Sequence, residues 1–187
     1  MGSPPTADSI NFGEVDSRTA PLIASAMGDE GDLVASRLAR GCRCFAAWAG
    51  GDVAGYGWLS TAPEWIGELQ LQIAPDKEEG YIWNCVTLPG HRRRGVFTLM
   101  LVGIIGWGRD AGLRRLWIGS VAIPAEKAVR PAGFRPALEF SSGGFMGLHW
   151  LAIKPSAEAD SNLVEAGCRV LSVRPGSSVH RSKHLRH

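Results

Sequence analysis

The stretch Val86-Thr-Leu-Pro-Gly-His-Arg-Arg-Arg-Gly-Val-Phe97 decides how this chain is interpreted. A strand-like segment ends there, a short basic loop follows, and a strongly apolar helix is predicted to begin. Backbone N–H groups at a helix start have no partner within the helix, and the helix dipole adds partial positive charge. Gly95 would let a ligand approach the backbone closely. Arg92, Arg93 and Arg94 add fixed positive charge, so the stretch predicts a pyrophosphate site.

Two common nucleotide motifs are missing from the same stretch. It lacks the Gly-x-x-x-x-Gly-Lys-Ser/Thr pattern of a P-loop and the Gly-x-Gly-x-x-Gly pattern that follows a first strand. Neither nucleotide hydrolysis nor a Rossmann dinucleotide site is therefore indicated.

The segments on both sides of this stretch predict an α/β fold with a mixed central β-sheet and flanking helices. Helices are predicted over Ser17–Met27, Asp29–Arg40, Gly95–Gly108 and Ala125–Ala132. Strands are predicted over Arg43–Trp48, Val53–Leu59, Glu64–Ile73, Tyr81–Leu88, Leu116–Val121, Phe134–Phe140 and Phe145–Ile153, with turns at Ala49–Asp52 and Ser141–Gly144. The order contains both hairpins and crossovers, which is typical of a mixed sheet.

A length of 187 residues and a hydrophobic content of 45% predict one globular domain. We expect a flexible leader over residues 1–9, the domain over residues 10–155, and a mobile or loosely docked tail over residues 156–187. Within that tail, Leu163–Val173 has the pattern of one further element.

The charge balance and the cysteine spacing exclude several classes of protein. With 20 basic and 18 acidic residues, the chain does not resemble a dedicated nucleic-acid binder. Cys42, Cys44, Cys85 and Cys168 lack the paired spacing of a zinc site, so we expect reduced thiols and no metal. A redox or metal pair formed by Cys42 and Cys44 is the alternative.

Nothing in the sequence predicts a membrane anchor or an export signal. The longest uncharged apolar run, Gly95–Gly108, falls short of the roughly 20 residues of a spanning helix. The first ten residues contain no basic region followed by an apolar region. We therefore expect a cytoplasmic protein.

Thr87–Phe97 resembles the coenzyme-A loop of GNAT-superfamily N-acetyltransferases. In that family a Val-x-Pro strand end precedes Arg/Gln-x-x-Gly-x-Gly/Ala. Arg92 fits its first position and Gly95 its second, whereas Phe97 stands where Gly or Ala is usual. Ala125–Phe134 resembles the family's second motif, a short helix that closes with Gly-Phe. Together with the element order, the resemblance covers about Ile10 to Ile153.

The resemblance implies transfer of an acetyl group from acetyl-CoA to a primary amine of a small molecule or peptide. It implies direct attack in a ternary complex, at a splay between the fourth and fifth strands, without a metal. Backbone groups on the fourth strand would bind the pantetheine and the thioester, and the loop would bind the pyrophosphate. These cofactor-binding residues are Cys85, Val86, Thr87, Arg92, Arg93, Arg94, Gly95, Val96, Phe97 and Thr98.

The usual general acid of the family is absent. Val129 occupies the position of a frequent Tyr, and Ala122 or Pro124 that of a frequent Asn. Ser120 is therefore a candidate to protonate the leaving thiolate or to position a water. Cys85 is an alternative, as a thiol donor or as a group that is itself acylated.

Two residues are candidates for removing the proton of the amine. Glu68 has apolar neighbours that would raise the pKa of its carboxyl, which suits a general base. Asn84, on the strand next to it, could order a water instead. For Ser120 and Cys85 the competing interpretation is a strand residue with ordinary packing, and for Glu68 it is a surface carboxylate on an alternating strand.

Several alternatives stay open from the sequence. The first is a GNAT-like acyl-CoA-binding or regulatory module without turnover, and the second is a nucleic-acid contact through Arg92–Arg94. The acceptor could be a polyamine, an antibiotic amine, an amino acid or a protein N-terminus, with Tyr56 or Tyr81 lining its cleft. The resemblance also makes a homodimer reasonable.

Overall fold

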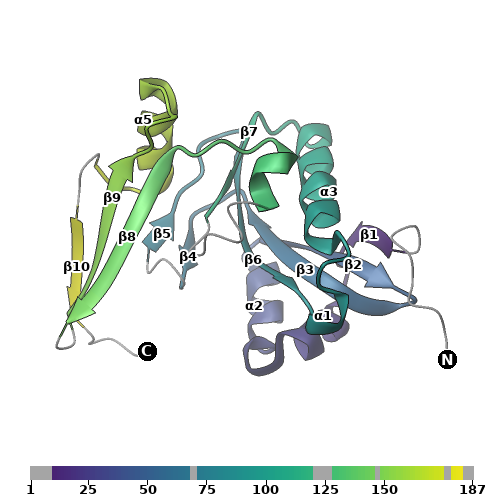
Figure 1. Ribbon diagram of the computed structural model, residues 1–187. Coiled ribbons are helices and arrows are strands. Elements are labelled where there is room, and N and C mark those ends of the chain that lie inside the picture. Colours follow the sequence, from purple (N-terminus) through teal and green to yellow (C-terminus); the bar gives the residue numbers. More distant parts are fainter. Residues whose placement is uncertain (1–9, 68–70, 120–127, 146–147, 175–177, 183–187) are drawn as a thin grey trace.

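The computed structural model describes residues 10–67, 71–119, 128–145, 148–174 and 178–182. A five-stranded sheet in the order β1-β2-β3-β6-β7 forms its centre (Figure 1). The strands are β1 (Ile10–Glu14), β2 (Arg43–Ala49), β3 (Asp52–Ser60), β6 (Glu79–Thr87) and β7 (Arg115–Ile118). Antiparallel pairing joins β1 through β6, and β7 then pairs parallel to β6. The mixed central sheet is thus confirmed.

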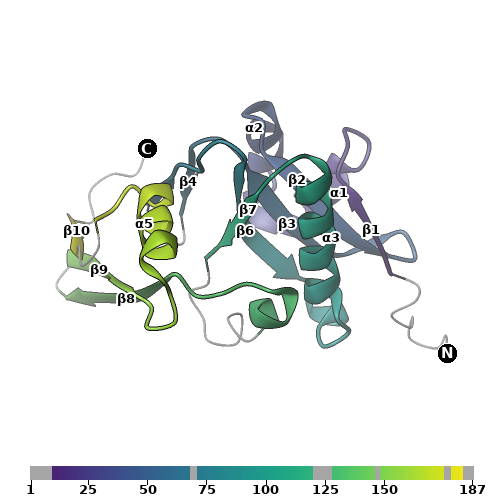
Figure 2. The ribbon, with the colours of Figure 1, turned by 90° about the horizontal axis from the view of Figure 1, so that it is seen from above.

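Helices cover both faces of this sheet (Figure 2). On one face lie α1 (Ala20–Met27), α2 (Leu33–Ala39) and the short 3-10 turn η2 (Gly28–Glu30) between them. On the other face lies α3 (Val96–Asp110), which follows the 3-10 turn η3 (Pro89–His91). A further 3-10 turn, η4 (Arg130–Ala132), precedes Gly133-Phe134.

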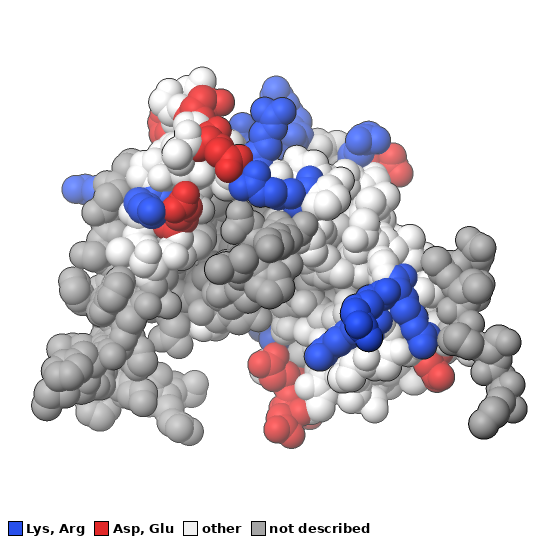
Figure 3. Space-filling model, in the orientation of Figure 1, with Lys and Arg blue, Asp and Glu red and all other residues white. Residues whose placement is uncertain are grey.

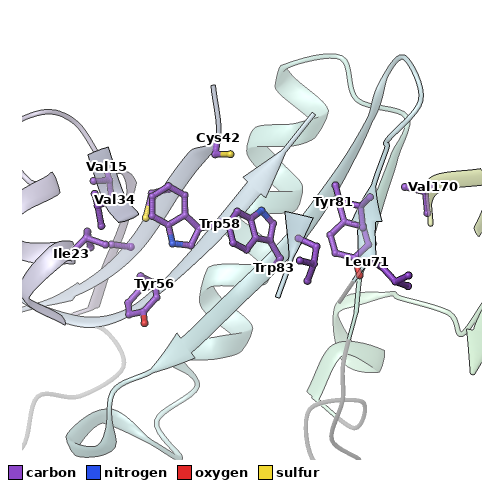
Figure 4. Close-up of a cluster of buried hydrophobic side chains, with 14 of the residues drawn as sticks. Val15, Ile23, Val34, Cys42, Tyr56, Trp58, Leu71, Tyr81, Trp83 and Val170 are labelled. Carbon is purple, nitrogen blue, oxygen red and sulfur yellow. The ribbon is translucent and has the colours of Figure 1, made fainter. Parts of the chain in front are cut away.

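Two apolar layers hold the helices on the sheet. Between the sheet and α1–α2, Ile23 and Val34 pack with Trp58 in a cluster that extends to Tyr56 and Trp83 (Figure 4). On the α3 face, Phe45, Leu101 and Ile104 form a second cluster and are fully buried. Burial of this apolar surface is the main force that stabilises the fold.

A smaller sheet stands beside the central one (Figure 1). Its antiparallel strands are β8 (Leu138–Phe145), β9 (Leu148–Pro155) and β10 (Ser178–Ser182), in the order β10-β9-β8. Next to it lies α5 (Ser161–Val170), whose end packs into the core cluster through Val170 and Leu171. The Ala74 N–H also donates to the Val170 carbonyl at 2.7 Å. The further element expected within Leu163–Val173 is thus the helix α5. The mobility of residues 156–187 stays a prediction.

The structure corrects three details of the predicted elements. Glu64–Ile73 is not one strand but the hairpin β4 (Glu64–Ile66) and β5 (Leu71–Ile73). Ser141–Gly144 does not form a turn but continues β8, because the pairing partner β9 supplies hydrogen bonds along the whole segment. Ile10–Glu14 was not expected as a strand, and it forms β1 because the edge of β2 is available to it.

Across the described ranges, none of the helices combines the length and the apolar character that crossing a lipid bilayer requires.

Candidate functional site

Strands β6 and β7 pair along the first half of β6. Their described register runs from Glu79↔Arg115 to Ile82↔Ile118, and β6 itself extends to Thr87. The Glu79 carboxylate stabilises the paired end, because it accepts bonds from Arg115 and the Trp117 indole at 2.8 Å each. Burial changes at the same point: β6 is buried through Trp83 and half-buried beyond it. Among the described residues, no position of β7 pairs with Asn84, Val86 or Thr87.

A β-bulge shapes β6 two residues beyond its last described pair with β7. Asn84 has a φ of +44°, and the register places Gly57 of β3 opposite both Asn84 and Cys85. The extra residue puts Trp83 and Asn84 on the α1–α2 face and turns Cys85 toward α3, in the second core cluster. A Cβ on Gly57 would lie 2.7 Å from the Cys85 Sγ, so only glycine leaves room for this thiol.

The loop after β6 leads directly into the start of α3. Gly95 begins the helix with a φ of +76°, and a Cβ there would meet nothing within 4 Å. The Leu99 N–H donates to the Gly95 carbonyl at 2.9 Å. For the N–H groups of Arg93–Thr98, by contrast, no described residue is an acceptor. An open backbone and N–H groups without a described acceptor are features that an anion-binding site requires, and the site itself stays a prediction.

The three arginines of this loop surround one shallow hollow. Arg92, Arg93 and Arg94 line it together with Pro89 and Gly90. None of the three is in an ion pair with a described acidic residue, and basic side chains gather below α3 in Figure 3. Their charges are therefore available for an anionic ligand.

Sequence reasoning missed a polar cluster on the opposite face. The Glu30 carboxylate, in η2, accepts a bond from the Asn84 side chain at 3.3 Å and one from Arg37 at 3.1 Å. Arg37 lies at a helix position that faces the core, between Val34 and Leu38 in the apolar stripe of α2. That single arginine within an apolar stripe was the one signal in the sequence that could have revealed the cluster.

The remaining candidate residues have clear positions or lie outside the described residues. Glu68 and Ser120 lie outside them. Tyr56 and Tyr81 are buried in the core, and burial raises the pKa of the Tyr56 hydroxyl. Val129 is buried in the α3-side cluster, so the position of the family's Tyr is filled by apolar packing.

None of the cysteines in the described part of the chain forms a disulfide. Burial raises the pKa of both Cys42 and Cys44, which keeps them protonated. The Cys42 thiol donates to Glu64 at 3.0 Å. No group of three His, Cys, Asp or Glu side chains in the described part of the chain is arranged to hold a metal ion.

A family model described as acetyltransferase (GNAT) family matches residues 16–134. The chain belongs to this GNAT acetyltransferase family. The matched residues include β6, the basic loop, α3 and Gly133-Phe134. The resemblance that these motifs carry is thereby confirmed, and no curated protein matches the chain closely enough to count as a relative.

Solved structures of GNAT proteins share the fold at low sequence identity. A Trypanosoma brucei acetyltransferase is 15% identical, with a TM-score of 0.51, over 67% of this chain and 92% of that one. An aminoglycoside N-acetyltransferase in complex with CoA is 16% identical, with a TM-score of 0.53, over 67% and 91%. A ribosomal-protein-alanine N-acetyltransferase from Brucella melitensis biovar Abortus 2308 is 15% identical, with a TM-score of 0.52, over 73% and 98%. At these identities the likeness shows the fold.

Proposed function

We propose that this GNAT protein transfers the acetyl group of acetyl-CoA to a primary amine of a small molecule or peptide in a ternary complex. One observation carries the proposal: β6, whose described pairing with β7 ends at Ile82, runs through a basic loop into a helix start whose N–H groups have no acceptor among the described residues. Acetyl-CoA carries its thioester and its pyrophosphate at two ends of a long flexible molecule. An extended strand edge followed by an anion site would bind both ends.

The loop residues fit the anionic end of acetyl-CoA. Helix N-termini bind phosphate through free N–H groups and the helix dipole, and arginine side chains add charge-assisted hydrogen bonds. Arg92, Arg93 and Arg94 would supply the side chains, and Gly95, Val96, Phe97 and Thr98 the backbone of this site.

The β6 residues fit the pantetheine and thioester end. Val86 and Thr87 have no β-strand partner on the β7 side among the described residues, so their backbone groups on that edge can bind amides, and we propose the same role for Cys85 just before them. The Thr87 hydroxyl is buried without a hydrogen-bond partner among the described residues, and a ligand amide would satisfy it. A backbone N–H here would also stabilise negative charge that develops on the thioester oxygen.

The amine must lose a proton to become a nucleophile. We propose that Asn84, on the bulge of β6, orders a water for that step; the roles of Glu68 and Ser120 stay predictions as well. Since Val129 cannot donate a proton, CoA leaves as the thiolate or receives its proton from another group, for which Ser120 is the candidate.

Similar folds support an amine acceptor. One solved structure, 17% identical with a TM-score of 0.53, holds the bisubstrate analogue CoA-S-monomethyl-acetylneamine. The bound molecule joins a CoA moiety to an amine-bearing acceptor in that protein. For the present chain a small-molecule amine is the class that this likeness favours, and the homodimer and the cytoplasmic location stay predictions.

Calorimetric titration with acetyl-CoA, followed by an amine panel with detection of the released thiol, tests the proposal. We expect micromolar binding and thiol release that depends on the amine. Binding without turnover of any amine would instead favour the acyl-CoA-binding module. An absence of binding at about 1 mM acetyl-CoA, an affinity weaker than roughly −4 kcal/mol, would overturn the proposed function.

A further inference from the structure

A chain of buried hydrogen bonds ends on Trp83, the residue just before the bulge residue of β6. The Trp83 indole N–H donates to the Ser60 hydroxyl at 3.0 Å, and that hydroxyl donates to the Cys42 Sγ at 3.3 Å. The Cys42 thiol donates in turn to Glu64 Oε2 at 3.0 Å. All the donors thus point the same way, from β6 toward one carboxylate. Ser60 and Glu64 are only 2% and 8% exposed, so burial shields these bonds from competing water.

The Glu64 carboxylate at the far end of the chain is fixed and charged. Arg40 donates to it twice, from Nε to Oε2 at 3.1 Å and from Nη2 to Oε1 at 3.2 Å, and the Trp65 N–H donates to Oε1 at 3.0 Å. Burial raises the pKa of the Glu64 carboxyl, but these bonds and the one from Cys42 outweigh it and bring the pKa below its usual value. A charged acceptor strengthens the bond that ends on it, and aligned hydrogen bonds polarise one another.

The Trp83 ring is also a contact surface for the Arg37 guanidinium. The guanidinium carbon lies 4.6 Å from the centre of this ring and 5.2 Å from that of Trp58, and the two ring centres are 6.0 Å apart (Figure 4). Arg37 Nη1 is buried and bonds to no described residue. Cation–π contact with the indoles is therefore a main restraint on the guanidinium, and a rotation of the Trp83 ring would displace it.

Arg37 connects the Trp83 ring to the next residue of β6. Its Nη2 donates to Glu30 Oε2 at 3.1 Å, and the same oxygen accepts a bond from the Asn84 side-chain amide at 3.3 Å. Asn84 is the bulge residue, with a φ of +44°, to which we assign the ordering of a water. Two consecutive residues of β6 are thus held by linked sets of side-chain contacts, of which one ends on Glu64 and the other on Glu30.

We propose that Ser60, Cys42 and Glu64 are positioning residues for the transfer reaction. They act through the Trp83 ring, and the group that they orient is the Asn84 amide. None of them belongs to the basic loop, so their removal changes turnover and leaves the binding of the acyl donor intact. The inference rests on the proposed acetyltransferase function and on the role given there to Asn84.

Cys42→Ala removes the middle of the chain, and Cys44→Ala is its matched control. Cys44 is also buried and lies two residues further along, but its thiol donates to the Phe45 carbonyl at 4.0 Å, outside the chain. We expect Cys42→Ala to lower kcat about 3- to 10-fold, as for the loss of one hydrogen bond, without a change in the KM for acetyl-CoA. Cys44→Ala should keep the kcat of the wild type, measured at a temperature at which all variants are folded.

Two further variants complete the kinetic comparison. Cys42→Ser should restore kcat, because a hydroxyl can accept a bond from Ser60 and donate one to Glu64. Ser60→Ala removes a single oxygen and leaves the Trp83 indole N–H without its acceptor, so kcat should fall as in Cys42→Ala. If Cys42→Ala does not fold, Ser60→Ala takes its place in the comparison.

Nuclear magnetic resonance supplies a readout that does not depend on turnover. In Cys42→Ala and in Ser60→Ala, the indole N–H signal of Trp83 and the side-chain amide signals of Asn84 should both shift. In Cys44→Ala the Asn84 signals should stay in place. Thiols that only fill space would give no such difference between the two cysteine positions.

The outcomes separate this inference from the proposed function. An unchanged kcat in Cys42→Ala, an equal fall in Cys44→Ala, a failure of Cys42→Ser to restore kcat, or unmoved Asn84 signals would overturn the positioning role. A wild-type protein that binds no acetyl-CoA, or releases no thiol with any amine, would instead overturn the proposed function. The Asn84 signals would then still decide whether the chain of bonds reaches the bulge.

Discussion

At the scale of single residues, Gly95 is the position where backbone conformation and ligand approach coincide. Its φ of +76° is unfavourable for side chains, and the direction of a Cβ is empty space in front of the free amides of α3. The glycine is therefore needed twice, once for the left-handed backbone and once for the space that we assign to the donor phosphates.

Gly95→Glu should weaken acetyl-CoA binding at least about 10-fold, because a carboxylate would occupy the place of the phosphates. The strain in the left-handed conformation should also cost about 1–2 kcal/mol of stability. Calorimetric titration measures the first effect and urea unfolding the second.

Gly112→Glu is the matched control for this substitution. Gly112 has a φ of +80° and equally open surroundings, but it follows the other end of α3. The control should lose similar stability and retain acetyl-CoA affinity. Equal affinities in both variants would show that the loop does not bind the donor.

At the scale of single elements, the bulge in β6 depends on one close contact. Gly57→Ala would place a methyl group 2.7 Å from the Cys85 Sγ, which we expect to cost about 1–3 kcal/mol. In the double variant Gly57→Ala/Cys85→Ala the nearest remaining atoms lie at 3.6 and 3.7 Å, which is ordinary contact. Urea unfolding should therefore show the double variant to be more stable than Gly57→Ala alone. A double variant as unstable as the single one would refute the contact as the cause.

The start of α1 depends on the charge of Asp16. Bonds from the Thr19 hydroxyl and N–H, together with Arg18, lower the pKa of the Asp16 carboxyl from 3.8 to about 2. Because the folded-state pKa is below the unfolded value, the charge stabilises the fold above about pH 4. This contribution is lost as the pH falls toward 2.

Asp16→Asn should therefore be less stable than the wild type at pH 6, since it lacks the charge that the surrounding donors stabilise. The difference in unfolding free energy between the two proteins should shrink between about pH 4 and pH 2. Urea unfolding across that range measures it. A difference that stayed constant with pH would contradict the role of the charge.

At the scale of the whole molecule, the chain beyond the matched residues 16–134 contributes to the core. Leu171, directly after α5, is 4% exposed and belongs to the cluster that includes Leu71 and Ile153. The second sheet and α5 are thus joined to the acetyltransferase fold by apolar contact as well as by the chain.

Leu171→Ala should lower the free energy of unfolding by about 2–5 kcal/mol, as expected for a buried leucine. Leu22→Ala provides the comparison, because Leu22 is 47% exposed and its removal should cost less than about 0.5 kcal/mol. Both are measured by urea unfolding of the full chain. Similar small losses in the two variants would mean that the C-terminal segment is not a structural part of the domain.

The sequence by itself determined those features that depend on residues close together in the chain. The basic loop, the glycine at the start of α3 and the hairpin of β2 and β3 are local patterns, because capping, turns and periodicity operate over a few residues. The same reason explains why the mixed sheet and the family resemblance could be predicted from the order of such elements.

Only the tertiary structure decided the features that join distant segments. β1 forms because the edge of β2 accepts it, and Glu64–Ile73 divides into two short strands that pair with each other. Glu30 and Asn84 meet across 54 positions of the chain, held by an arginine whose indole partners lie on two other strands. Side-chain contacts of this kind depend on how the helices pack on the sheet, which no local pattern encodes.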